Sequence, residues 1–235
     1  MLVQIRSLMA FSGIVLALVC GAALAESAGQ VVHLSGTLSA QKPDGTIRIL
    51  GRGSEINMGD TLTTQAESYG QLGFTDGSTM TMRPNTVMKV EAYLFDREKP
   101  AADNAFFRLI KGGLRTATGL IGKRGSMTAY KIGTRVATIG IRGSTGDTLD
   151  CTQGCDGVTS TSGKAERGVY HATYTGSYVM ENESGEIIIG EARFGFVNDV
   201  KTRPVLLPGD PGLNLDELPF AILGQDRGGK CDVVR

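Results

Sequence analysis

Tryptophan is absent from the 235 residues, and histidine occurs only twice, as His33 and His171. Neither histidine lies near a serine elbow, a pair of carboxylates or a cysteine nucleophile motif, so no pattern predicts a catalytic triad. Acidic and basic residues are equal in number, 24 of each, so the overall charge argues neither for nucleic acid as a partner nor for adsorption to a membrane. From these absences we expect a protein that is not an enzyme and that binds neither a cofactor nor a metal ion.

Long runs of the helix-forming residues Ala, Leu, Glu and Lys are also missing. Glycine accounts for 33 residues, about twice its usual share of a protein. Between the glycines lie short segments rich in Thr, Val, Ile and aromatic residues, which favour pleated strands. A chain of this texture turns often and forms few helices, so the predicted fold class is all-β.

One long apolar run is present, at residues 10–25. It follows the positive charge of Arg6 and ends in Ala23-Leu24-Ala25, the small-x-small pattern of a cleavage site. The sequence therefore predicts a signal peptide of residues 1–25, a mature chain that starts near Glu26, and a periplasmic or secreted location. The run is too short and interrupted for a permanent span of about 20 residues, so we expect no membrane span after cleavage.

Three of the four cysteines follow the predicted cleavage site: Cys151, Cys155 and Cys231. A pair is expected to close in an oxidising compartment. A disulfide between Cys151 and Cys155 would staple a short loop and is the preferred pairing, although Cys231 could instead pair with either one. The spacing does not indicate zinc, because a lone C-x3-C without a nearby histidine lacks the four ligands of a structural site.

Apolar residues alternate on both sides of Asp76-Gly77-Ser78, which predicts a hairpin with these three residues as its loop. In that register Phe74 faces Met80 and Leu72 faces Met82, so that all four side chains share one buried face. The two methionines would also suit Cu(I), but no third methionine or histidine is near in sequence. Core packing is therefore the preferred role of both.

Glycine and proline also predict where other strands end. The pair Gly112-Gly113 predicts a turn between strands at residues 106–110 and 114–117. From Thr202 onward, prolines recur among glycines and acidic residues, a composition that interrupts both sheets and helices. We therefore expect residues 201–235 to form an extended tail.

Basic residues are unevenly distributed. Between residues 104 and 146 there is no acidic residue but eight basic ones, here called the basic strip: Arg108, Lys111, Arg115, Lys123, Arg124, Lys131, Arg135 and Arg142. A cationic strip on an exported domain could hold an anionic partner, such as an envelope polysaccharide or an acidic protein face. The preferred alternative is that these side chains point to water, balanced on neighbouring strands by Glu181, Glu183, Glu186 and Glu191.

Several segments, taken in order, resemble the FecR domain. Its opening is similar to residues 57–64, 72–78 (with Asp76-Gly77-Ser78) and 82–86, and its second half to residues 107–115 and 133–144. The last motif is Arg142-Gly143-Ser144 here, where the family usually has Arg-Gly-Thr. These motif residues are interpreted as turn-formers and not as ligands.

The resemblance implies an exported all-β domain that is solenoid-like or sandwich-like, here at residues 26–200 with a core at 31–149. The family's best-known members form the periplasmic part of an iron-uptake regulator that also carries a cytoplasmic anti-sigma segment and a membrane helix. In this sequence the domain follows the predicted signal directly, without those two parts.

These observations predict an exported, non-enzymatic binding or scaffold module of the cell envelope. Its expected partner is a protein or an envelope glycan, and not nucleic acid. The alternative is an extracytoplasmic sensor that acts on a membrane-bound regulator or in iron-uptake signalling. A hydrolase with an unrecognised site ranks last, and the sequence does not predict an oligomeric state.

Overall fold

The computed structural model describes residues 27–124, 128–155 and 165–212. The predicted signal peptide, Cys231 and the later part of the predicted tail lie outside the described residues. The described chain contains fifteen strands, one short α-helix, α1 (Leu120–Arg124), and one 3-10 turn, η1 (Pro100–Ala102). The all-β prediction is confirmed.

All fifteen strands belong to one sheet, which is antiparallel except where β9 runs parallel to β10. The pairing divides this sheet into two layers. Layer A contains, in spatial order, β3 (Ile47–Leu50), β2 (Leu38–Gln41), β5 (Thr61–Thr64), β8 (Val87–Leu94), the first half of β9 (Asn104–Ala117), β10 (Tyr130–Gly133), the first half of β11 (Thr138–Asp150), the second half of β12 (Val169–Asn182) and β13 (Gly185–Gly190).

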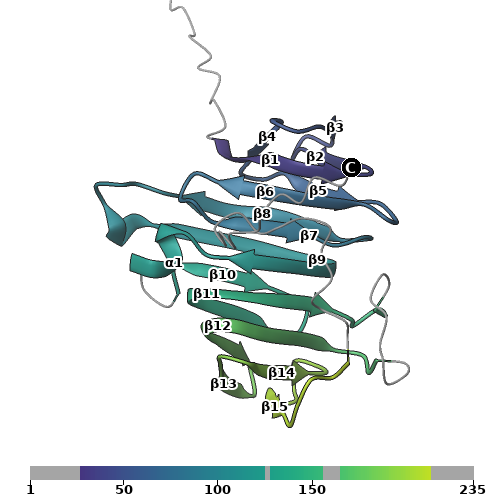
Figure 1. The fold of residues 1–235 in the computed structure, drawn as a ribbon, viewed down its shortest axis with the longest axis vertical. Coiled ribbons are helices and arrows are strands. Elements are labelled where there is room, and N and C mark those ends of the chain that lie inside the picture. Colours follow the sequence, from purple (N-terminus) through teal and green to yellow (C-terminus); the bar gives the residue numbers. More distant parts are fainter. Residues whose placement is uncertain (1–26, 125–127, 156–164, 213–235) are drawn as a thin grey trace, which may run out of the picture.

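Layer B contains the remaining strands and the other halves of the three long ones. In spatial order these are β4 (Glu55–Asn57), β1 (Ser27–Ser35), β6 (Tyr69–Phe74), β7 (Thr79–Met82), the second halves of β9 and β11, the first half of β12, β14 (Arg193–Val197) and β15 (Val205–Leu207). In Figure 1 the strands run across the view and follow one another from β3 and β4 at the top to β15 at the bottom.

Long strands pass from one layer to the other. The first half of β9 pairs with β8 and β10, whereas its second half pairs with β7 and β11. The change of direction occurs at Gly112, whose φ of 89° lies in the left-handed region that favours glycine. The predicted turn at Gly112-Gly113 is therefore wrong, because these residues bend one continuous strand instead of reversing the chain.

Threonine hydroxyls tie this corner to the corners stacked beside it. The Thr86 hydroxyl donates to the Gly113 carbonyl (3.1 Å) and accepts from the Gly113 N–H (3.0 Å). In the next corner the Thr64 hydroxyl accepts from the Thr86 N–H (3.0 Å) and donates to the carbonyl of Arg83 (2.6 Å). Backbone groups that leave the strand ladder at the bend thus find partners in side chains.

Apolar side chains from the facing surfaces of both layers fill the space between them. They include Leu72, Phe74, Met80 and Met82, each buried, so the prediction of core packing for the two methionines is confirmed. Alternation along each strand places these side chains on the inner face. The Phe74 ring packs against those of Tyr93 and Phe107, at centroid distances of 5.5 and 4.9 Å.

The predicted register of the β6–β7 hairpin is wrong by two residues. Leu72 pairs with Met80, and the Phe74 N–H donates to the Ser78 carbonyl (2.9 Å), so the loop is Thr75-Asp76-Gly77. The Gly77 N–H closes the turn on the Phe74 carbonyl, and Gly77 has a φ of 84°. The loop length was predicted correctly and its position was not, because a shift of two leaves every side chain on the same face.

Beyond residue 200 the sheet gains one more strand. β15 pairs with β14 inside the segment that was predicted to be an extended tail. Pro204 and Pro208 flank this strand directly, and proline cannot donate to a ladder, which limits β15 to three residues.

Replacement of Gly112 by alanine is expected to destabilise the fold more than replacement of Gly77. Both residues have positive φ, which costs a non-glycine residue about 1–2 kcal/mol. A Cβ at Gly112 would lie 2.7 Å from the Thr86 Cα, whereas one at Gly77 would meet no atom within 4 Å. We expect urea unfolding to show that the free energy of unfolding falls by about 2–5 kcal/mol in Gly112→Ala and by about 1–2 kcal/mol in Gly77→Ala. Equal losses would contradict the tight corner.

Candidate functional site

The structure disperses the basic strip over both layers and pairs several of its members. Arg108 forms an ion pair with Glu91 (2.9 Å), Arg115 with Asp147 (2.7 Å) and Arg124 with Asp103 (3.0 Å). Within the described residues, no ion pair joins the strip to Glu181, Glu183, Glu186 or Glu191. The positive charge of the strip is thus neutralised in part, but by Glu91, Asp147 and Asp103 and not by the four glutamates that the sequence suggested.

The side chain of Asp147 is completely buried, with no exposed surface. Its Oδ2 accepts from Arg83 (2.8 Å), from Arg115 (2.8 Å) and from the Tyr174 hydroxyl (2.9 Å), and its Oδ1 accepts from Arg115. The Arg115 guanidinium also stacks over the Tyr174 ring, 4.7 Å from its centroid. Arg115 therefore holds layer B together and is not a surface cation for a partner.

Arg124 has a similar structural role at the end of α1. It donates to both Asp103 oxygens and to the carbonyls of Asp96 and Arg97, and it lies over the Phe95 ring at 4.9 Å. These contacts fasten α1 to the long loop between β8 and β9. Arg124 therefore anchors this loop and is not a free surface cation.

Within the described residues, the side chains of three strip residues form no hydrogen bond or ion pair: Lys123, Lys131 and Arg142. Lys123 and Arg142 are exposed, and the Lys123 side chain lies beside Gly143, the neighbour of Arg142. Arg135 is exposed too, and its guanidinium donates to the side-chain carbonyl of Gln153. The cations open to a partner are therefore a minority of the predicted strip.

The two motif turns that carry the family resemblance converge on the segment of residues 118–124. Asp76 is buried, and its carboxylate accepts from the Ser78 N–H (3.0 Å), the Ser78 hydroxyl (2.6 Å) and the Tyr93 hydroxyl (3.1 Å). The same carboxylate accepts from the Ile121 N–H in α1 (3.2 Å), and the Asp76 carbonyl accepts from Leu120 N–H (2.9 Å). Asp76 thus joins the hairpin to the start of the helix.

The second turn holds the other side of this segment. The Ser144 N–H donates to the Thr118 hydroxyl (2.9 Å), and the Ser144 carbonyl accepts from the Thr118 N–H (3.1 Å). The Ser144 hydroxyl donates to the Ser177 carbonyl and accepts from the Ser177 N–H, which links the bends of β11 and β12. Arg142-Gly143-Ser144 is therefore a corner between layers, built around a serine hydroxyl.

We call this assembly the motif cap and define it as residues 76–78, 118–124 and 142–144. Its inner side is apolar, since Ile121 is fully buried between the layers. Its outer side presents Leu120, which is 43% exposed, together with Lys123 and Arg142. The cap brings together sequence motifs more than 60 residues apart and exposes one apolar side chain and two cations.

Sequence reasoning missed α1, the centre of the motif cap. The segment that contains it reads Gly119-Leu-Ile-Gly122-Lys123-Arg124. Its glycines serve close packing, because a Cβ at Gly119 would lie 2.4 Å from the Asp76 carbonyl and one at Gly122 would lie 2.8 Å from Thr118. These two glycines, close in sequence to a motif, were the only feature of the sequence that could have indicated this closely packed helix.

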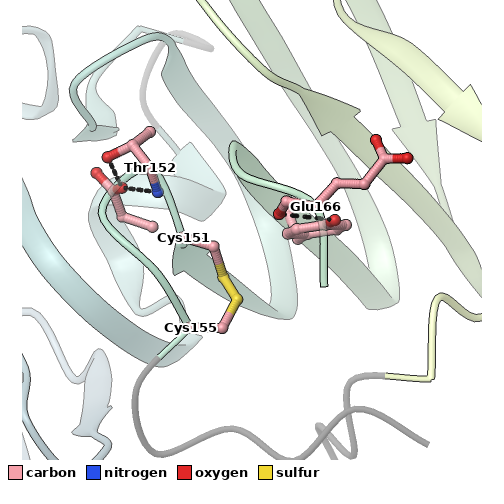
Figure 2. Close-up of a disulfide and its surroundings, with 6 residues drawn as sticks. Cys151, Thr152, Cys155 and Glu166 are labelled. Atoms are coloured by element: carbon pink, nitrogen blue, oxygen red, sulfur yellow. Dashed lines mark hydrogen bonds between the residues drawn. A yellow bond between two sulfur atoms is a disulfide. The ribbon is translucent and has the colours of Figure 1, made fainter. Parts of the chain in front are cut away.

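The structure contains the expected disulfide between Cys151 and Cys155, whose Cα atoms are 4.5 Å apart. Figure 2 shows it beside Thr152, whose N–H donates to an Asp150 oxygen (3.0 Å) and whose hydroxyl bonds to the same atom. Across from it the Tyr170 hydroxyl donates to the Glu166 carbonyl (3.1 Å). The disulfide closes a loop whose Gln153 meets Arg135.

His171 lies in a structural environment within the described residues. His171 is buried, its Nδ1 lies 3.0 Å from the Thr148 hydroxyl, and its ring packs on that of Tyr178 at a centroid distance of 4.0 Å. Burial lowers the pKa of His171 to about 3. In the part of the chain that the structure describes, no three His, Cys, Asp or Glu side chains cluster as metal ligands would, and no helix has the length and apolar character to cross a membrane.

Asp147→Asn is expected to destabilise the protein by about 3–5 kcal/mol, because Arg83 and Arg115 stay buried after their shared anion is lost. The matched control is Glu91→Gln, which breaks the more exposed Arg108–Glu91 pair and should cost less than about 1 kcal/mol. Urea unfolding at neutral pH measures both. Similar losses in the two variants would show that Asp147 is not the structural anion described here.

His171 makes stability depend on pH. The folded chain keeps this imidazole neutral down to about pH 3, whereas the unfolded chain takes up a proton below about pH 6.5. The contribution of His171 to the free energy of unfolding is therefore fully present above pH 6.5. It decreases toward pH 3, by about 1.4 kcal/mol for each unit of pH below about 6. His171→Asn, which can keep a bond to Thr148 without titrating, should flatten the decline between pH 7 and 5 in urea unfolding. An unchanged slope would assign the dependence to other groups.

The FecR protein family model matches residues 60–165. Two crystal structures of a candidate anti-sigma factor from Parabacteroides distasonis are each 12% identical to this chain, with TM-scores of 0.47 and 0.46. Each alignment covers 64% of this chain and 60% of the other, so the chain spans less than two thirds of their length. A structure described as a cell surface anchoring domain is 24% identical over 26% of this chain and 82% of that one, with a TM-score of 0.26.

The comparison with curated proteins gives no match. The family match covers both turns of the motif cap, α1 between them, and the disulfide loop. The resemblance predicted from the motifs is therefore confirmed as a FecR domain at residues 60–165.

Proposed function

We propose that this chain is an exported, non-enzymatic FecR module that binds a protein partner through the outer surface of the motif cap. The observation that carries the proposal is the convergence of both family motifs on one rigid cap that exposes Leu120, Lys123 and Arg142. An exposed apolar side chain flanked by cations suits a partner surface with an apolar pocket and acidic residues around it.

The buried charged groups support a binding role over a catalytic one. Asp147 is held by two arginines and a tyrosine, Asp76 by backbone and hydroxyl donors, and His171 by the core. Each of these groups is already engaged in structural contacts in the described chain. All three are also buried, at most 3% exposed, whereas an acid or base in catalysis must reach the substrate.

A regulatory role is the second candidate, and the family match favours it. In this case the partner is a membrane-bound regulator, to which the module passes a signal from outside the cytoplasm. The two candidates share the same binding surface and differ in the identity of the partner. The export of the chain is part of both proposals and rests on the apolar run and cleavage pattern at residues 10–25.

Charge reversal on the cap tests the proposal. In affinity capture from envelope extract, Lys123→Glu/Arg142→Glu should lose partners that the wild-type chain retains, with at least about tenfold lower recovery. The matched control is Lys201→Glu, which reverses an exposed cation after β14, outside the cap. Circular dichroism confirms that each variant is folded.

The outcomes separate the candidates. If cap and control variants capture the same partners as the wild type, the cap is not the binding surface and the proposal fails. If the partner lost by the cap variant is a membrane-bound regulator, the module is regulatory; if it is another envelope protein, the module is a scaffold. Recovery of an enzymatic activity from the purified chain would overturn the non-enzymatic part.

A further inference from the structure

Four strands end the two layers, and three of them are protected against pairing with another chain. β15 is flanked by Pro204 and Pro208, which cannot donate to a neighbouring strand. β13 carries Glu186 and is bordered by Glu183 and Glu191, so a second acidic edge would repel it. β4 has only three residues and starts with the exposed Glu55. Natural sheets use such short, charged or proline-bounded edges to prevent association.

β3 is less protected than these three strands. It contains no proline, and its residues are Ile47, Arg48, Ile49 and Leu50. Ile47 and Ile49 lie on the outer face of layer A and are 66% and 72% exposed. Within the described chain β3 pairs only with β2, so its other edge is unpaired.

The register shows which backbone groups this edge presents. The Lys42 N–H donates to the Thr46 carbonyl, and the pairing continues with Ala40 opposite Arg48 and Leu38 opposite Leu50. Hydrogen-bonded and non-hydrogen-bonded pairs alternate in an antiparallel ladder, so the backbone of Arg48 is hydrogen-bonded to β2. The backbone N–H and C=O groups of Ile47 and Ile49 therefore point away from β2, toward the unpaired edge. The same two residues thus offer exposed apolar side chains and unpaired backbone groups.

We propose that β3 is a self-association edge, at which two copies of this chain pair antiparallel around a two-fold axis at Arg48. Ile47 of each copy then exchanges backbone hydrogen bonds with Ile49 of the other, and the four isoleucines cover one another on the outer face. The two copies of layer A become one continuous sheet.

Charge complementarity selects this register and a second copy as the occupant. With the axis at Arg48, the turn that holds Asp44 in each copy adjoins the turn that holds Arg52 in the other, and both residues are exposed and form no ion pair within the described chain. A shift of the pairing by two residues in either direction loses that match. The two Arg48 side chains meet at the axis, but each is neutralised within its own copy by Asp60 at 2.6 Å.

The edge is short, so a weak, concentration-dependent dimer is expected, dissociating in the micromolar range. Sedimentation velocity on the purified chain at increasing concentration should show a monomer that converts to a dimer. Ile49→Lys should abolish the dimer, because it places a charge in the isoleucine cluster. The matched control is Ile188→Lys on the protected strand β13, where the side chain is equally exposed at 65% and the dimer should persist.

A charge exchange tests the register. Asp44→Arg alone and Arg52→Asp alone should each weaken the dimer about tenfold, since like charges then face each other at both ends. The double variant Asp44→Arg/Arg52→Asp should restore wild-type association. An equimolar mixture of the two single variants should form a heterodimer that neither forms alone.

The results that overturn the proposal are equally specific. A chain that stays monomeric throughout the micromolar range, or a dimer that survives Ile49→Lys, excludes β3 as the edge. A dimer lost with Ile49→Lys but indifferent to the charge exchange excludes the register around Arg48. Circular dichroism separates each of these from misfolding, and none depends on the motif cap or its partner.

Discussion

The structure depends on strands that turn a corner without ending. β9, β11 and β12 each contribute to both layers, so the two halves of the sheet cannot separate without breaking a continuous ladder. The bend leaves backbone groups without ladder partners, and hydroxyls such as those of Thr86 and Ser144 satisfy them. Because the glycine at the Gly112 bend lies against the Thr86 backbone, the corner is as tightly packed as the core.

The motif cap follows from the same constraint. Where β11 bends at residues 142–144, the layers leave an open end, and α1 closes it with Ile121 buried between them. Asp76 is buried at this point because several donors surround its carboxylate, which offsets the cost of removing a charge from water. The family motifs thus connect the hairpin, α1 and the bend of β11, and these contacts also hold the backbone that carries the exposed side chains of the cap.

The sequence predicted the features that local chemistry determines: the strand-rich fold, the burial of Met80 and Met82, and the disulfide. It failed where the outcome depends on distant partners. Gly112 bends a strand because Thr86 lies beside it and bonds to Gly113. Nothing within residues 106–117 distinguishes such a bend from a turn that reverses the chain. The hairpin register failed because alternation fixes a face but not a position along it. Arg115 was assigned to a surface strip because its partner, Asp147, lies 32 residues away in sequence.

This last failure shows why charge counts mislead in a folded sheet. Arginine can pair with a buried carboxylate through two parallel bonds, so burial removes Arg115 from the pool of surface cations while its neighbours in sequence stay exposed. Two of the cations that remain exposed, Lys123 and Arg142, lie on backbone that the cap contacts hold in place. Binding of a partner to them would cost the conformational entropy of two side chains but not that of the segments that carry them. This lower cost favours specific binding over non-specific electrostatic attraction.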